Sequence, residues 1–357
     1  MAGTERRATP RATPRATPRA TPRATRRATR RAATSVAAVL ALVAVVAACT
    51  NPPGSGPGAP PTTVTPLPGP PGSFSVLTYN VAGLPQGISG SDPERNMGLI
   101  SPLLDDYDLV LTQEDFDWWQ PLAGLLDFAN YHERLRASTT FPYRSAQHPG
   151  PIAVGLDPSS RPLLVGDGLG WLSRYPFTGE RRVPWTGCNG GPLPDGGAAD
   201  CLAMKGFGVV RTTLADGREV DVYNLHAEAG GTPLDQALQA DDFAQLAGFI
   251  AVHSAGRAVV LGGDTNLHTD LVHPDGSGGA DIVIWQEFLA ATGLTDTCDE
   301  LACPDPGSID KIAYRDGVGV DLDAVSWAMP TERFRAPDGS DLSDHPPVVV
   351  RFDWDAA

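Results

Sequence analysis

Short runs of β-forming residues, each ending in polar residues or in a turn, recur along the chain from residue 74 onward. Their alternation and apolar content predict strands at 74–80, 108–114, 170–176, 206–214, 219–226, 258–262, 311–314, 322–328 and 347–352. Ala215, Asp216 and Gly217 separate the fourth strand from the fifth, which favours a hairpin connection there.

Apolar residues at helical spacing predict helices at 93–104, 118–129, 233–253 and 282–291. The third helix has the clearest apolar stripe, with Leu238, Leu246, Phe249 and Ile250. Strands pair through hairpins and also alternate with helices along the chain. We therefore expect an α+β fold, a four-layer α/β/β/α sandwich of two mixed β-sheets with helices on the outside.

The first 72 residues differ in composition from the rest of the chain. Residues 1–31 repeat Arg, Ala, Thr and Pro and cannot bury enough apolar surface to fold. A short apolar run at 36–48 follows Arg30 and Arg31, as in an export signal, and its end resembles a bacterial lipobox before Cys49. Residues 49–72 are rich in Pro and Gly, which is typical of a semi-rigid tether.

These features predict three parts. Residues 1–48 form an Arg-rich low-complexity segment and a lipoprotein-type signal peptide, residues 49–72 form the tether, and residues 73–357 form one catalytic domain. We expect an exported protein, either secreted or anchored in the cell membrane by a lipid on Cys49. Ordinary signal cleavage beside an unmodified cysteine is the alternative to lipidation.

Removing the first 48 residues changes the charge of the chain. The whole chain has 27 basic and 42 acidic residues, of which residues 1–48 contain ten arginines and one glutamate. The remaining 17 basic and 41 acidic residues have a net charge of −24, and Lys205 and Lys311 are the only lysines in the sequence. Because non-specific binding of nucleic acid depends on cations that neutralise phosphates, DNA and RNA are less favoured as substrates.

Four cysteines follow Cys49 in the sequence. In an exported protein an even number of cysteines favours two disulfides, and we expect the local pairs Cys188–Cys201 and Cys298–Cys303. A zinc site is the alternative, but neither pair has Cys-x-x-Cys spacing.

Polar residues suited to phosphate chemistry follow five of the apolar runs. They are Asn80, Glu114, Asn224 with His226, Asp264 with Asn266, and Asp344 with His345. Alternation along the strand lets Asp264 and Asn266 face one pocket. One such residue alone is more often a cap or a surface group, but five such ends favour a shared site at one edge of the sheets.

In this order the motifs resemble those of the endonuclease/exonuclease/phosphatase superfamily, the deoxyribonuclease-I-like group of metal-dependent phosphodiesterases. The motifs are Thr78-Tyr-Asn80, Gln113-Glu114, Asn224-Leu-His226, Gly263-Asp-Thr-Asn266 and Ser343-Asp-His345, and the resemblance covers residues 74–353. Within the superfamily, residues 170–176 and 200–207 are similar to the sphingomyelinase branch.

The resemblance places the metal at Glu114 and at Asn80, the latter through its amide oxygen or a water. Mg²⁺ is the expected ion, with Mn²⁺ or Ca²⁺ as alternatives, because Mg²⁺ is commonly held by one or two carboxylates together with waters and substrate phosphate. His345 is the candidate general base, since an imidazole titrates near neutral pH. The resemblance implies a carboxylate that orients it, and Asp310 is the best match.

The remaining candidates are expected to act on the water and the phosphate. Asp264 and Asn266 would position both, and Asp344 would help to hold the metal or the phosphate. His226, as imidazolium, would stabilise the phosphorane.

Three residues are expected to assist in substrate binding. Asn224 would support His226, while Arg174 and Lys205 are candidates for contact with the phosphate. An ion pair with a surface carboxylate is the alternative for Lys205.

The sequence thus predicts a monomeric, Mg²⁺-dependent phosphodiesterase that hydrolyses a phospholipid head group or a small phosphate ester. An extracellular deoxyribonuclease-I-like nuclease and a non-catalytic surface lipoprotein of the same fold are the alternatives.

Overall fold

The computed structural model describes residues 72–84, 86, 89–120, 127–146, 166–190, 200–270 and 278–355, with only the backbone of residues 117–120 and 127–130. The export signal, the lipidation of Cys49 and residues 49–71 of the tether lie outside the described residues. Within the described part, no helix combines the length and the hydropathy that crossing a bilayer requires.

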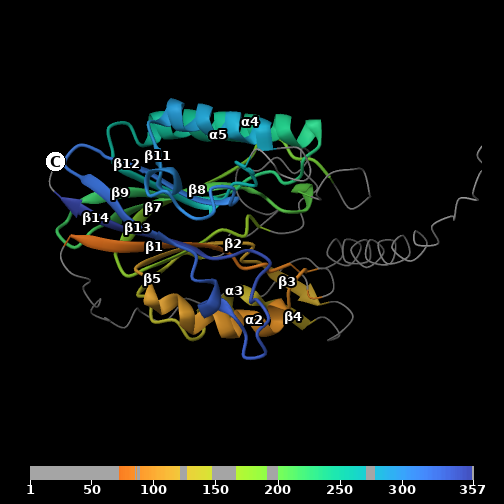
Figure 1. The fold of residues 1–357 in the computed structure, drawn as a ribbon. Helices are drawn as coiled ribbons and strands as arrows, with labels where there is room; N and C mark the ends of the chain where they lie inside the picture. Colours follow the sequence, from red (N-terminus) through yellow and green to blue (C-terminus); the bar gives the residue numbers. More distant parts are fainter. Residues whose placement is uncertain are drawn as a thin grey trace, which may run out of the picture.

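Two six-stranded mixed sheets form the centre of the molecule (Figure 1). Sheet I has the order β13–β14–β1–β2–β6–β5 and sheet II the order β11–β12–β10–β9–β8–β7. The strands of sheet I are β1 (Ser73–Asn80), β2 (Leu109–Gln113), β5 (Tyr143–Arg144), β6 (Gly170–Ser173), β13 (Asp321–Ala328) and β14 (Val348–Asp355). Those of sheet II are β7 (Phe177–Pro184), β8 (Gly206–Thr213), β9 (Glu219–His226), β10 (Val259–Asp264), β11 (Thr295–Asp296) and β12 (Asp310–Arg315). β1 is parallel to β2 and β9 is parallel to β10.

Helices cover the outer faces of both sheets, as expected for a four-layer sandwich (Figure 1). α4 (Pro233–His253) and α5 (Gly278–Thr292) lie over sheet II, and α2 (Pro93–Ile100) and α3 (Tyr131–Arg136) lie on the other side, over sheet I. The shorter helices are η1 (Ser101–Asp106), η3 (Asp200–Leu202), α6 (Thr297–Glu300) and η4 (Thr331–Phe334).

Local sequence explains where the longest helix begins. Thr232 and Asp235 form a capping box, and Pro233 occupies the first turn of α4, where its missing N–H is not needed. Leu246 and Ile250 of α4 then pack with Val259 and Leu261 of β10 in a buried apolar cluster between helix and sheet. A second cluster lies under α2 and α3, and a third fills the space between the sheets.

One predicted helix is wrong. Residues 118–129 were expected to be helical, but the structure has the antiparallel strands β3 (Asp117–Gln120) and β4 (Asp127–Asn130) at the ends of this segment. The consecutive residues Trp118 and Trp119 have high β propensity. Strand pairing outweighs the helical spacing of the leucines at 122, 125 and 126. The helix expected at 93–104 also changes to a 3₁₀ turn after Ile100, next to Pro102.

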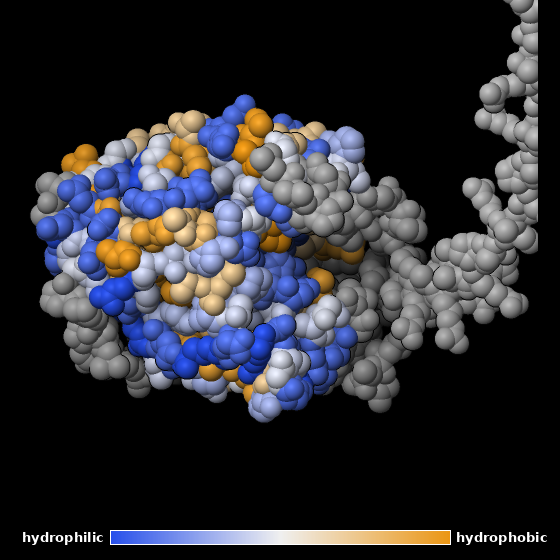
Figure 2. Space-filling view, in the orientation of Figure 1, coloured by the Kyte–Doolittle hydropathy of each residue, from blue (hydrophilic) through white to orange (hydrophobic). Residues whose placement is uncertain are grey.

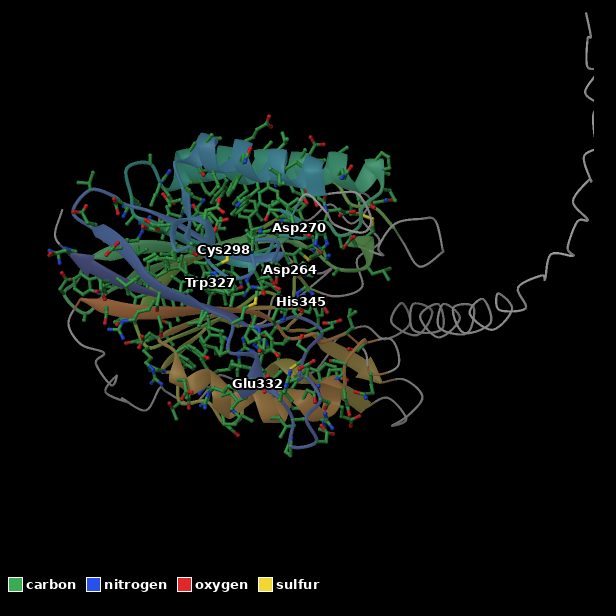
Figure 3. All side chains as sticks on the ribbon, viewed as in Figure 1. Asp264, Asp270, Cys298, Trp327, Glu332 and His345 are labelled. Atoms are coloured by element: carbon green, nitrogen blue, oxygen red, sulfur yellow. A yellow bond between two sulfur atoms is a disulfide. The ribbon has the colours of Figure 1, made fainter. Side chains whose placement is uncertain are left out.

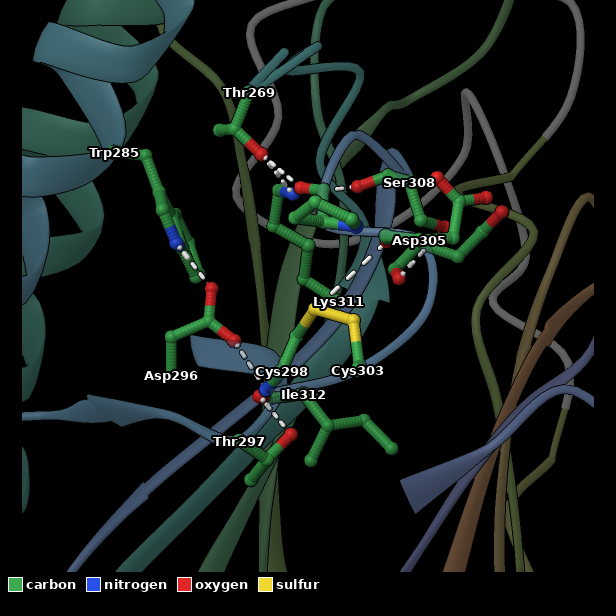
Figure 4. The surroundings of a disulfide bond; sticks show 12 residues. Thr269, Trp285, Asp296, Thr297, Cys298, Cys303, Asp305, Ser308, Lys311 and Ile312 are labelled. Carbon is green, nitrogen blue, oxygen red and sulfur yellow. Dashed lines mark hydrogen bonds between the residues drawn. A yellow bond between two sulfur atoms is a disulfide. The ribbon is translucent and has the colours of Figure 1, made fainter. Parts of the chain in front are cut away.

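Both local disulfides are confirmed, Cys188–Cys201 and Cys298–Cys303. Close to the second one, Asp296 accepts hydrogen bonds from the indole N–H of Trp285 at 2.7 Å and from the backbone N–H of Cys298 at 2.8 Å (Figure 4). These contacts tie α5 to the short segment that leads into β12.

The packing of α4 generates a stability prediction. Leu246 is completely buried, so Leu246→Ala should lower the free energy of unfolding by roughly 2–5 kcal/mol. Val252 lies on the same helix with 83 % of its surface exposed, and Val252→Ala should change the free energy of unfolding by less than about 0.5 kcal/mol. Urea unfolding of both variants measures the difference, and equal losses would contradict this packing.

Candidate active site

The polar strand ends predicted from the sequence converge at one end of the sandwich. Asn80 ends β1 and Glu114 follows β2, the parallel pair of sheet I. His226 and Asp264 end the parallel strands β9 and β10 of sheet II. β14 runs antiparallel to β1, so that the turn before it carries His345 to the same edge. Parallel strands therefore share the edge at which these side chains meet.

Three of these residues form a row across sheet II. Asp264 pairs in register with His226 on one side and with Asp310 on the other. All three are buried, and the Nε2 of His226 lies 3.4 Å from Oδ2 of Asp264. Neighbouring strands are about 4.8 Å apart, so strand pairing alone brings these side chains together.

His345 connects this row to sheet I. Its Nδ1 is hydrogen-bonded to Oδ2 of Asp310 at 2.8 Å, and its Nε2 lies 3.7 Å from Oδ2 of Asp264. Burial favours the neutral imidazole, but the carboxylates of Asp310 and Asp264 outweigh it and raise the pKa of His345 to about 10. Figure 3 shows Asp264 and His345 near one another at this end of the sandwich.

Asn80 places its amide nitrogen between carboxylates of the two sheets. Nδ2 donates to Oδ2 of Asp264 at 3.0 Å and to Oε1 of Glu114 at 3.2 Å, while Oδ1 accepts the backbone N–H of Ala82 at 3.0 Å. In this arrangement the amide nitrogen of Asn80 orients the two carboxylates, and its amide oxygen accepts the hydrogen bond from the backbone N–H of Ala82. Burial raises the pKa of Glu114, against the opposing effects of Lys205 and Asn80.

His226 is neutral, whereas the sequence led us to expect an imidazolium. Burial, together with the charge of Lys205, lowers the pKa of His226 to about 3. The side chain can still donate one hydrogen bond. Trp185, which the sequence did not single out for this purpose, donates its indole N–H to the carbonyl of His226 at 2.7 Å and supports its backbone.

Asn266 and Asp344 lie at the rim of the cluster. The backbone N–H of Asn266 donates to Oδ1 of Asp264 at 3.0 Å, and its side-chain amide donates to the carbonyl of Ala227 at 3.0 Å. Asp344 is exposed, directly before His345. Both are therefore adjacent to the buried residues and closer to solvent.

Lys205 is buried beneath the cluster and forms an ion pair with Asp200. Its ammonium group also donates to the carbonyl of Ala227 at 3.2 Å. Burial opposes its charge, but Asp200, Asp264 and Glu114 together raise its pKa, so the lysine stays charged. An ion pair is therefore present, but with the buried carboxylate of Asp200 and not with a surface carboxylate, and Lys205 also adds positive charge beside the site.

Arg174 does not belong to the site. Its backbone N–H donates to the carbonyl of Asp108 at 2.9 Å and its side chain to the carbonyl of Tyr107 at 3.2 Å, before the start of β2. Glu114 follows the opposite end of that strand, about 20 Å away at 3.3 Å per residue. The expected contact with phosphate is wrong, because β6 runs antiparallel to β2 and carries Arg174 away.

Asn224 does not face substrate either. It is completely buried, and its amide nitrogen donates to the carbonyls of Thr112 and Gly170, each at 3.0 Å. Its amide oxygen accepts from Nε2 of Gln113 at 2.7 Å. All of these partners belong to sheet I, so Asn224 links the two sheets.

Two cavities meet at His345. One has a volume of about 280 Å³ and is lined by Asp310, Asp344 and His345 together with the loop residues His268, Asp270, Asp305 and Ser308. The other, of about 230 Å³, has Tyr79, Phe334 and Arg335 in its wall. Asp270 and His345, both labelled in Figure 3, lie in the wall of the first cavity.

Sequence reasoning missed Asp270 and Asp305. Both lie in loops without an apolar run, where an isolated Asp resembles any surface carboxylate. Lys311 secures these loops: its ammonium group donates to Thr269 at 2.8 Å and to the carbonyl of Ser308 (Figure 4).

The carboxylates fit a hard divalent cation. Glu114 and Asp264 would supply oxygen ligands from their carboxylates, which lie on either side of the Asn80 amide, and oxygen is the ligand atom that Mg²⁺ prefers. Atoms of Asp264, Asp310 and His345 also lie within 4.8 Å of one another. We favour Glu114 with Asp264, because Asp310 and His345 already bind each other through Oδ2 and Nδ1.

Comparison with known proteins agrees with this geometry. The model of the endonuclease/exonuclease/phosphatase family matches residues 77–345. Sphingomyelinases of Mycobacterium tuberculosis and Mycobacterium bovis are 32% identical over 301 residues, which are 79% of this chain and 53% of each relative. The chain thus spans about half the length of the curated relatives it matches.

Solved structures share the fold. An endonuclease/exonuclease/phosphatase from Beutenbergia cavernae aligns with a TM-score of 0.53 at 17% identity, over 79% of this chain and 72% of that one. A beta toxin from Staphylococcus aureus with bound magnesium ions aligns with a TM-score of 0.50 at 15% identity, over 78% of this chain and 99% of the toxin chain.

Glu228, next to the site, generates a prediction about pH. Burial and the nearby Asp200 raise the pKa of Glu228 from 4.5 to about 8. The folded protein then binds more protons than the unfolded chain between these values, so stability falls as the pH rises through this window. Glu228→Gln removes the effect and should raise Tm relative to wild type more at pH 8 than at pH 5.

Thermal unfolding at the two pH values tests this. Glu332→Gln is the matched control, because the side chain of Glu332 is 81% exposed and should show no such difference. A Tm difference between Glu228→Gln and wild type that is the same at pH 5 and pH 8 would rule out the buried, protonated Glu228.

Proposed function

The chain belongs to the endonuclease/exonuclease/phosphatase family. From this membership we propose that it is a hydrolase of phosphoric ester bonds, namely an exported, Mg²⁺-dependent phosphodiesterase of phospholipids with a cationic head group. One observation carries the choice of substrate. The larger cavity beside His345 is lined by the carboxylates of Asp270, Asp305 and Asp344.

A carboxylate-lined cavity attracts a positive group and repels a negative one. Its volume of about 280 Å³ suits a head group and is close to the lower limit of ordinary ligand pockets. A nucleic acid would bring further phosphates next to these carboxylates, at an energetic cost. The similarity to sphingomyelinases supports the same choice.

The buried cluster supplies groups for hydrolysis. Asp310 holds the Nδ1 of His345, so that Nε2 faces Asp264 and the interior of the cluster, where it can take a proton from an attacking water. When bound at Glu114 and Asp264, the cation would stabilise charge on the phosphate and oppose the negative potential that keeps His345 protonated. Asn80 donates a hydrogen bond to Asp264, the Nε2 of His226 lies 3.4 Å from the same carboxylate, and Lys205 adds a positive charge beside them.

Anchoring at the membrane would bring the enzyme to a lipid substrate. The apolar run at 36–48, the lipobox-like residues before Cys49 and the Pro/Gly-rich tether support this part of the proposal. On the face shown in Figure 2, hydrophilic residues are widespread and hydrophobic residues lie in patches between them. A tether would supply membrane contact without requiring one large apolar surface.

Activity on a panel of esters tests the proposed function. Sphingomyelin and phosphatidylcholine vesicles, phosphatidylglycerol vesicles, bis(p-nitrophenyl) phosphate and plasmid DNA are compared with Mg²⁺ and with EDTA. We expect Mg²⁺-dependent release of phosphocholine, and His345→Ala should lower kcat by about 10²–10⁴-fold. Arg174→Ala should keep wild-type kcat, because Arg174 lies at the other end of β2.

Three outcomes would refute this assignment. The first is degradation of plasmid DNA as the main activity. The second is hydrolysis of phosphatidylglycerol at the same rate as the choline lipids, and the third is activity that persists in EDTA.

The acidic cavity generates a separate prediction. Asp270→Asn and Asp305→Asn should each raise KM for a choline phospholipid several-fold, because removing one charge weakens attraction of the cation. KM for bis(p-nitrophenyl) phosphate, which lacks a cationic group, should stay within twofold. Asp323→Asn, the same charge change on β13, serves as the control. A KM increase shared by both substrates would assign these residues to phosphate binding instead.

A further inference from the structure

The reactive groups are divided between the two sheets, so their spacing depends on how the sheets pack. Glu114 and Asn80 come from sheet I, while His226, Asp264 and Asp310 come from sheet II. Between the sheets lies an apolar cluster that includes Val76, Leu111, Val222 and Val260. Apolar contacts are not directional, so they define the relative position of the two sheets less sharply than hydrogen bonds do.

A polar bridge crosses this apolar layer next to the site. The side-chain amide of Gln113 on β2 donates from Nε2 to Oδ1 of Asn224 on β9 at 2.7 Å. Asn224 Nδ2 donates back to the carbonyl of Thr112 on β2 and to that of Gly170 on β6. Neither amide is exposed, and the one hydrogen bond between them and the two to backbone carbonyls are all directional.

The backbone is shaped to admit this bridge. Asn224 pairs in register with Gly208 on one side and with Gly262 on the other. A Cβ at Gly262 would lie 2.8 Å from Leu111, and one at Gly208 would lie 2.5 Å from Trp171, both on sheet I. Glycine at both positions therefore lets the two sheets approach closely beside Asn224.

The bridge lies next to the reactive residues along both strands. Gln113 directly precedes Glu114. Its Nε2 also donates a hydrogen bond to the hydroxyl of Thr78 at 3.1 Å, and Thr78 lies two residues before Asn80 on β1. Asn224 is two residues before His226, so the two side chains point to the same face of β9. A shift of the bridge would therefore move Glu114 relative to His226.

We propose that Gln113 and Asn224 are a pair of positioning residues whose inter-sheet hydrogen bonds set the distance between Glu114 and the His226–Asp264–Asp310 row. Neither residue touches substrate. This inference rests on the proposed function for its kinetic readout, but not for its measurement of metal binding.

The test compares Gln113→Met, Asn224→Ala and the double variant with wild type. Gln113→Met keeps the volume of the side chain and removes its hydrogen bond to Asn224, while the bonds from Asn224 to the carbonyls of Thr112 and Gly170 remain. Asn224→Ala removes all three of these hydrogen bonds. The matched control is Ser254→Ala, which removes buried hydrogen bonds to Asp221 and Tyr223 on the face of β9 opposite to Asn224. All variants should lose stability, so each rate is divided by the folded fraction.

Gln113→Met and Asn224→Ala should each lower kcat by roughly 10–100-fold with a smaller change in KM, and the double variant should lose no more than the worse single variant. Ser254→Ala should keep kcat within twofold. Calorimetric titration with Mg²⁺ alone is the second measurement, in which the bridge variants should bind roughly tenfold more weakly than wild type.

A kcat within twofold of wild type together with unchanged Mg²⁺ affinity in Gln113→Met would overturn the inference, as would additive losses in the double variant. A wild-type protein that hydrolyses no ester of the panel would refute the proposed function, and the Mg²⁺ titration would still decide the role of the bridge.

Discussion

Two buried carboxylates, Asp264 and Asp310, lie side by side on neighbouring strands, and their repulsion is the constraint around which this end of the molecule is built. Buried charges of like sign are costly unless cations and hydrogen bonds compensate them. His345 lies between them, bonded to Asp310 and close to Asp264, and Lys205 and Asn80 add to the compensation. A site in this state retains a strong affinity for positive charge, which suits a phosphodiesterase that uses a divalent cation.

The two kinds of structure in this protein contribute differently to the proposed activity. Strand ends carry the cluster, because strands held in register place side chains with little freedom. Loops carry the residues that would recognise the head group, including Asp270 and Asp305. Loop residues can change without moving the strands, so the same fold can serve different phosphate esters.

The sequence predicted most of the fold, and its errors have physical causes. The strand ending at Asn80 and the helix at 233–253 were predictable because each has a clear period and a defined end. Residues 118–129 also satisfied a helical period, yet they contain paired strands, since spacing alone does not record which neighbours are available to a segment. Arg174 follows a motif correctly placed on a strand, but the direction of that strand carries the arginine to the wrong edge.

By itself the sequence determined which residue types could do the chemistry and that they follow apolar strands, because periodicity and turn residues are local properties. It also determined the two disulfides, whose partners are close along the chain. Tertiary structure alone decided that Asn224 bridges the sheets, that His226 is neutral and that Asp270 and Asp305 line a cavity beside His345. Each of these depends on groups distant in sequence, whose burial and spacing arise only when the two sheets pack together.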